Sequence, residues 1–238
     1  MIKTAIFTVA SGDYRYFVPM FRYCAERACP DSTIIVHEAE YWPNEAAAMR
    51  FLLDEKTATF LDRPLSDYER VLITDVDILM AGDDPIAERF NHLIKNRLLC
   101  YSNVCNDPGS CPGVHFVTSA WWEYTRKARE EELENLYHLT TLGSDVPKGY
   151  DERMLYRLIA NSNLPLPPVG IVGCHGIHLG AWRDAVKRLG KPQLDAKEKN
   201  QLAALLADEK LMNVAEECAK KLPLIKEIFK VIRNGAAS

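Results

Sequence analysis

Two aspartates one residue apart are the strongest chemical signal in the sequence. Asp75 and Asp77 come directly after segment 70–74, which predicts a buried strand. Alternation along a strand would aim the two carboxylates at opposite faces, but a chain that turns away from the strand can bring both toward one ion. Carboxylate oxygens are the hard ligands that Mn²⁺ and Mg²⁺ accept, so the pair predicts a metal site for a nucleotide's diphosphate. The alternative interpretation is that Asp77 caps a turn and Asp75 pairs with an arginine.

A histidine later in the chain is a candidate third ligand. His178 lies near the end of the apolar run 171–179, which glycines interrupt at 173 and 176. Glycine allows close backbone approach, and imidazole is a usual ligand for borderline divalent metals. His175 could take the same role, and either histidine could instead be a hydrogen-bonded residue of the core.

The elements around these residues follow a strand–helix alternation. Strands are predicted at 3–10, 33–37 and 70–74, with helices at about 17–24 and 44–53 between them. Further strands are predicted at 98–103 and 114–118, and helices at 120–137, from about 151, and from 182 to the end, with Pro223 starting the last helix. This order predicts βαβ units, an α/β fold and a mostly parallel central sheet, whose carboxyl-terminal edge is where such folds bind ligands.

The composition narrows the class of protein. The chain has 238 residues, a formal net charge of −4 and 47% hydrophobic residues, enough for one sizeable core. The acidic balance argues against broad nucleic-acid binding. No apolar stretch approaches the ~20 residues that cross a bilayer, and the start does not read as a signal peptide. The seven cysteines form no Cys-x-x-Cys pair, which indicates free thiols and a cytoplasmic location rather than a disulfide framework or structural zinc.

Six short motifs in order carry a family resemblance. They are TVASGDY at 8–14, AMRF at 48–51, DVD at 75–77, PGVHF at 112–116, YDE at 150–152 and HLG at 178–180. Over about residues 3–183 the chain resembles GT-A glycosyltransferases of the glycogenin and lipopolysaccharide-galactosyltransferase type. The resemblance implies a single Rossmann-like nucleotide-sugar-binding GT-A domain at 1–190, followed by a helical extension at 191–238.

The resemblance also implies an activity, which is transfer of a sugar from a nucleotide-sugar donor, UDP-linked by expectation, to a hydroxyl of a saccharide, lipid-linked or protein acceptor. Mn²⁺, or Mg²⁺ in its place, would lie on the donor's diphosphate, held by Asp75, Asp77 and His178. In that family the end of the first strand and the residues around the metal motif contact the donor. Those positions correspond here to Thr8, Val9, Ala10, Tyr14, Arg50 and Val76.

Two departures from the family pattern affect the chemistry. The third acidic position of the family's Asp-Gln-Asp motif is Arg153 here, and Ala-Trp-Arg at 181–183 replaces its Lys-Pro-Trp. Arg183 could still hold the leaving diphosphate, because a guanidinium forks onto phosphate oxygens. Asp151 and Glu152 open a helix, where one of them could deprotonate the acceptor hydroxyl or Asp151 could simply cap the helix.

The last predicted helix is amphipathic. Within 223–235, an apolar stripe opposes a face that carries Lys226, Lys230 and Arg233. This pattern is typical of helices at a membrane surface, and anionic lipid would favour the cations. The alternatives are that the stripe packs back on the core or forms a homodimer.

Two rival functions remain at the level of the sequence. A non-catalytic protein that binds nucleotide-sugars or carbohydrates on the same fold would keep the motifs without turnover, and Arg153 is the feature in its favour. A haloacid-dehalogenase-type phosphatase also has an Asp-x-Asp pair, but it expects a threonine where this chain has Leu79.

Overall fold

A five-stranded sheet forms the centre of the fold. The computed structural model describes residues 4–39, 68–80, 90–91, 95, 100–102, 114–118, 120, 124–141, 176–179 and 196–236. The strands lie in the order β2-β1-β3-β6-β5, with the bounds β1 (Thr4–Ser11), β2 (Thr33–Ala39), β3 (Arg70–Thr74), β5 (Cys100–Ser102) and β6 (Val114–Thr118). β1 is parallel to β2 and β3, whereas β6 is antiparallel to both β3 and β5. Within this five-stranded sheet, as far as it is described, every strand except β6 therefore runs in one direction, which confirms the predicted α/β class and its mostly parallel sheet.

The two central strands β1 and β3 are buried on both faces. Ile6 and Leu72 pair in register on one face, and Phe7 and Ile73 pair on the other, and all four are buried. Continuous apolar strands of this kind are expected where both faces of a parallel sheet are covered. The carboxyl ends of β1 and β3 therefore lie side by side on a rigid support.

The first crossover begins at a glycine. Gly12 has φ +51°, a left-handed conformation that glycine adopts without strain, and it turns the chain from β1 into the 3₁₀ helix η1 (Gly12–Phe17). Helix α1 (Val18–Ala28) follows, with Pro19 in its first turn, where a missing N–H removes no helical hydrogen bond. Met20, Phe21 and Cys24 on α1 are buried against the sheet.

A small second sheet lies beside α1. It pairs β4 (Ile78–Met80) with β7 (Gly176–His178) in antiparallel register, and β4 also contacts α1. The sequence did not predict β4, because three apolar residues after an Asp-x-Asp turn do not show a strand period of their own.

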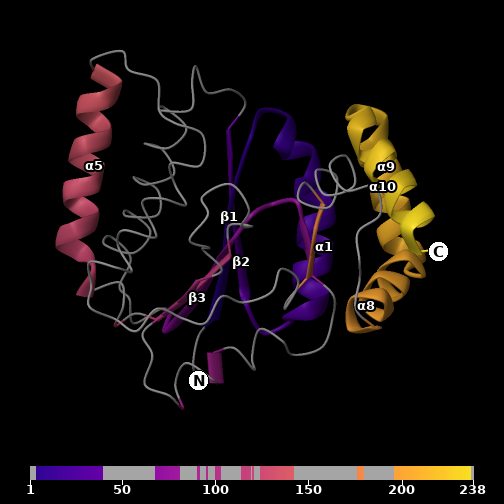
Figure 1. Cartoon of the computed structure of the whole chain (residues 1–238), viewed down its shortest axis with the longest axis horizontal. Coiled ribbons are helices and arrows are strands. Elements are labelled where there is room, and N and C mark those ends of the chain that lie inside the picture. The colour runs from indigo at the N-terminus through magenta and orange to yellow at the C-terminus, as the bar shows by residue number, and fades with distance from the viewer. Residues whose placement is uncertain are drawn as a thin grey trace.

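Three helices at the carboxyl end form an outer layer: α8 (Ala196–Leu206), α9 (Glu209–Lys221) and α10 (Pro223–Ala236). Figure 1 shows them on the side of α1 that faces away from the sheet, while α5 (Arg126–Thr141) lies at the opposite end of the molecule. The buried side chains of α8, α9 and α10 belong to the same hydrophobic core as Ile6 and α1. The expected helical extension is thus present; the domain boundary at 190 lies outside the described residues and stays a prediction.

The apolar stripe of the last helix is covered by protein. Ile225, Ile228, Phe229 and Ile232 of α10 are buried in the common core. The stripe therefore packs back on the fold, which was one of the alternatives, and the prediction that it faces a membrane is wrong for these side chains. Within the described part of the chain, no helix is long and apolar enough to cross a bilayer.

Some helices have bounds that differ from the predicted ones, and some predicted helices lie outside the described residues. α5 extends to Thr141, beyond its predicted end at 137, and Thr125 forms a turn within the predicted span. The predicted helices at 44–53 and from 151 lie outside the described residues.

Candidate metal centre

The two aspartates lie on a tight turn where β3 ends. The main-chain N–H of Ile78 donates a hydrogen bond to the carbonyl oxygen of Asp75 at 3.4 Å, so the chain reverses over residues 75–78 before entering β4. The Asp77 side chain is 5% exposed, whereas that of Asp75 is 44% exposed. The turn therefore presents one carboxylate from the interior and one from the surface.

His178 reaches the turn because β7 pairs with β4. Ile78 lies opposite His178 in the antiparallel register, and the N–H of Leu179 donates to the carbonyl oxygen of Asp77 at 3.0 Å. These main-chain bonds bring two segments that are far apart in the sequence to one place. The imidazole side chain is 15% exposed and lies over the turn.

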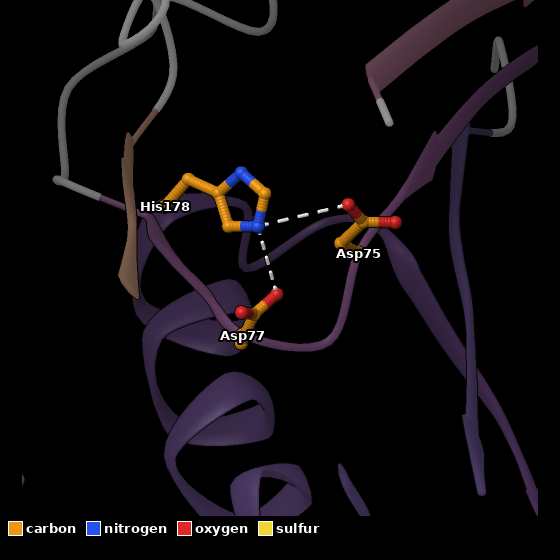
Figure 2. Close-up of side chains that lie close together, drawn as sticks. All are labelled: Asp75, Asp77 and His178. Atoms are coloured by element: carbon orange, nitrogen blue, oxygen red, sulfur yellow. Dashed lines mark ion pairs between the residues drawn. The ribbon is translucent and has the colours of Figure 1, made fainter. Parts of the chain in front are cut away.

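The three side chains converge on one point (Figure 2). Nε2 of His178 lies 3.2 Å from Oδ1 of Asp77 and 3.8 Å from Oδ2 of Asp75. One potential ligand atom from each residue lies within 4.8 Å of the others. Ligands about 2.1 Å from a cation are roughly 3.0 Å apart at right angles and about 4.2 Å apart on opposite sides. The two separations from Nε2 of His178 fall between these values, and all three ligand atoms lie within 4.8 Å of one another, so the three residues are spaced as a site for a small divalent cation requires.

The expected donor contacts from β1 differ in how accessible they are. Thr8 and Ala10 are buried, and Val9 is half-buried. The Tyr14 side chain is 50% exposed, and its ring lies 5.9 Å from that of Phe17. Tyr14 can therefore offer its side chain to a ligand, whereas Thr8 and Ala10 are covered as whole residues in this structure.

The Val76 side chain belongs to the hydrophobic core. It is buried with the residues of α1 and β4, so a donor contact by Val76 would also have to use the main chain. Its burial has a structural consequence, because an apolar anchor between the two aspartates fixes the turn that presents them.

A residue that the sequence analysis did not single out lies next to the cluster. Thr74 ends β3 directly before Asp75, and Thr8 occupies the corresponding place on β1, one residue beyond the Phe7–Ile73 pair. The hydroxyls of both threonines are buried without a hydrogen-bond partner within the described structure. The sequence feature that could have identified Thr74 is a polar residue at the end of an otherwise apolar strand.

The other predicted site residues lie outside the described part of the chain. They are Arg50, Asp151, Glu152, His175 and Arg183, and their roles stay predictions.

The comparisons with known proteins found likenesses among solved structures. No protein-family model and no curated protein matches the sequence. Among solved structures, the apo form of the glycosyltransferase GlyE of Streptococcus pneumoniae TIGR4 is similar at 13% identity, with a TM-score of 0.45 over 68% of this chain and 44% of that one. A glycosyltransferase involved in glycosylating the major capsid of PBCV-1 is similar at 17% identity, with a TM-score of 0.48 over 78% of this chain and 91% of that one.

The galactosyltransferase LgtC, solved with donor and acceptor sugar analogues, is similar at 13% identity, with a TM-score of 0.27 over 83% of this chain and 99% of that one. This chain spans less than half the length of GlyE, since it covers 44% of that protein. Because every TM-score is below 0.5, these likenesses assign no residue role, donor or acceptor to this chain.

Proposed function

We propose that the protein is a metal-dependent glycosyltransferase that moves a sugar from a nucleotide-sugar, UDP-linked by preference, to an acceptor hydroxyl. One observation carries the proposal: a buried carboxylate, an exposed carboxylate and an imidazole converge at the carboxyl end of a central strand. That edge is where open α/β sheets bind nucleotides. The motif resemblance supports the same assignment independently of these distances.

Asp75, Asp77 and His178 would hold Mn²⁺ or Mg²⁺. Such a cation, when bound, neutralises the charge of a diphosphate and so makes the nucleoside diphosphate a better leaving group. The partial exposure of Asp75 leaves the cluster open on one side, where a diphosphate oxygen can approach. Because Asp77 is buried away from water, the effective dielectric around it is low and its interaction with a cation is stronger than it would be at the surface.

The remaining roles follow from the resemblance. The exposed Tyr14 and the half-buried Val9 would contact the base and ribose, and the resemblance assigns the same role to the buried Thr8 and Ala10. Arg50 would contact the donor, the main chain of Val76 would border its diphosphate, and Arg183 would hold the leaving group. Asp151 or Glu152 would accept the proton of the acceptor hydroxyl as that oxygen attacks the anomeric carbon and the sugar–phosphate bond breaks.

Thermal unfolding with Mn²⁺ and UDP tests the assignment. A ligand at a hundred times its dissociation constant stabilises the folded state by about 2.7 kcal/mol, so wild type should melt at a clearly higher temperature with both present than with either alone. Asp77→Asn should lose this shift. Asp31→Asn is the matched control, because Asp31 is exposed and precedes β2 at the opposite edge of the sheet.

Two other results would change the conclusion. The absence of any shift in wild type, with any nucleoside diphosphate and either metal, would overturn the proposal and leave the cluster as an ion pair between a protonated His178 and the two aspartates. A shift without release of UDP from a panel of UDP-sugars would favour the non-catalytic binding protein.

A further inference from the structure

A groove runs along the outer face of the last two helices. It encloses about 550 Å³ between α9 and α10, a volume typical of small-molecule sites. These helices lie at the end of the molecule farthest from α5 (Figure 1). The groove is lined by Met212, Ala215, Glu216, Ala219, Lys220, Ile225, Lys226, Phe229, Lys230, Arg233 and Asn234.

The helical repeat explains why these residues share one groove. On α9, Met212, Ala215 and Ala219 recur at spacings of three and four, and on α10, Ile225 and Phe229 do the same. Ala215, Ile225 and Phe229 are nearly buried and present only their outer edges at the base of the groove, whereas Met212 and Ala219 are half-buried beside it. The floor is consequently apolar.

A side-chain contact joins the two helices beside the groove. Nη2 of Arg233, near the end of α10, lies 3.5 Å from the sulfur of Met212, near the start of α9. The two helices therefore form an antiparallel hairpin around the groove. This contact also holds the Arg233 guanidinium at the rim.

The rim carries an excess of positive charge. Lys226, Lys230 and Arg233 follow one another at spacings of four and three along α10, so they form one row. Within the described structure, neither Lys226 nor Lys230 pairs with a carboxylate, while Lys220 on the α9 side pairs with Glu217. Glu216 is the one acid among the groove residues. A row of unpaired cations is notable in a chain whose net charge is −4.

We propose that this groove binds a small anionic amphiphile as a monomer, with its alkyl chain between the helices and its phosphate head on the Lys226–Lys230–Arg233 row. The apolar residues lie at the base of the groove and suit an alkyl chain, whereas the polar and charged side chains lie along its rim and suit an anionic head. Unpaired ammonium and guanidinium groups bind phosphate through charge-assisted hydrogen bonds. The eleven groove residues are also fewer than the roughly 20–30 residues that each partner contributes to a stable protein interface.

The proposal goes beyond the metal centre and does not depend on it. Dodecyl phosphate below its micelle concentration is the probe, and isothermal titration calorimetry on the full chain is the measurement. One molecule should bind per chain. Dodecyl maltoside, which shares the tail, and inorganic phosphate, which shares the head, should each bind at least about tenfold more weakly.

Variants locate the binding. Lys226→Gln with Lys230→Gln should weaken dodecyl phosphate at least about tenfold, because charged hydrogen bonds to the head are lost. Lys210→Gln with Lys221→Gln removes the same charge from exposed lysines of α9 outside the groove and should leave the affinity unchanged. Ala219→Leu, which fills the floor, should weaken binding of the tail, and Asp77→Asn should have no effect.

Several results would overturn the proposal. They are no binding of dodecyl phosphate, an equal loss in both lysine pairs, or full affinity in a folded Ala219→Leu. Binding to vesicles of equimolar phosphatidylcholine and phosphatidylglycerol without binding of the monomer would also overturn it, since that result means adsorption of a basic surface rather than a site.

Discussion

The metal centre and the α9–α10 groove are assembled in opposite ways. Asp75 and Asp77 meet His178 only because β7 pairs with β4 across a long stretch of chain. The groove is made entirely from residues between 212 and 234 on one hairpin. The first site joins negative groups around a point, and the second joins an apolar floor to a positive rim. A site of the first kind depends on the register of strands, whereas one of the second kind depends on local helix packing.

The two regions nevertheless share one hydrophobic core. The buried side chains of β1, α1, β4, α9 and α10 form a single cluster, which extends from Ile6 to Ile232. The hairpin is therefore part of what stabilises the sheet. Single substitutions can therefore test whether a residue contributes to the stability of the shared core or to the chemistry of one site.

The largest expected effect is on folding. Ile232→Ala removes a buried side chain from the face of α10 that meets the core, and truncations of this kind cost about 2–5 kcal/mol. Chemical denaturation followed by circular dichroism should show one transition at lower denaturant. Lys230→Gln, at an exposed position of the same helix, should change stability by less than about 0.5 kcal/mol. Early melting of the helices alone, with the sheet signal unchanged, would mean that the hairpin is a separate unit.

The next effect compares the two aspartates. Asp77 is buried and its carboxylate lies closer to Nε2 of His178, whereas Asp75 is partly exposed and more distant. Changing groups that only support a metal ligand already costs 10–100-fold in metal affinity, so Asp77→Asn should weaken Mn²⁺ binding at least about 100-fold. Asp75→Asn should cost less, because water can replace an exposed ligand. Manganese titration with UDP present measures both, and a larger loss for Asp75→Asn would show that the cluster is not organised around Asp77.

The sequence predicted these two regions with unequal success. The strand at 70–74 and the helices of the hairpin follow from short-range apolar patterns, and β3, β6 and α10 were found at or near their bounds. The meeting of Asp75, Asp77 and His178 is different, since no local pattern encodes which strand lies beside which. The glycine-interrupted run around His178 and the order of motifs in the family resemblance indicated it, but neither predicted which strands pair. β4, whose pairing creates the meeting, was missed because its three apolar residues show no strand period of their own.

For the hairpin, the sequence predicted the helix faces but not what they contact. Helical spacing correctly predicted that Ile225, Ile228, Phe229 and Ile232 share one face, but spacing cannot say what covers that face. The structure covers it with the protein's own core. The basic row at the edge of the same helix was also visible in the sequence, yet its place beside the groove that Ala215 and Ala219 line depends on how α9 packs against α10.

The smallest expected effect concerns the junction between the hairpin and α1. Asp208 caps α9 by accepting a hydrogen bond from the N–H of Leu211 at 3.1 Å, and its carboxylate also accepts from the Tyr23 hydroxyl at 3.0 Å and pairs with Arg27, both on α1. Burial by itself raises the pKa of the Asp208 carboxyl, but the hydrogen bonds from Leu211 and Tyr23 and the charge of Arg27 together hold that pKa below its usual value. The charged form of Asp208 is thus favoured by folding.

Because the pKa of Asp208 is lower in the folded chain than in the unfolded chain, its contribution to stability is present above the unfolded pKa of about 3.9 and is lost as the pH falls through the folded pKa. Asp208→Asn keeps a capping side chain and removes the charge, so at pH 7 it should cost only about 0.3–1 kcal/mol. The difference between wild type and this variant should disappear near pH 2, as urea denaturation at both pH values can measure. Glu209→Gln, one residue further along the same helix and exposed, controls for charge at the helix start. If the difference instead persists unchanged at low pH, the charge of the Asp208 carboxylate beside α1 contributes nothing to the free energy of unfolding. The hairpin would then be held to the rest of the fold by its apolar face alone.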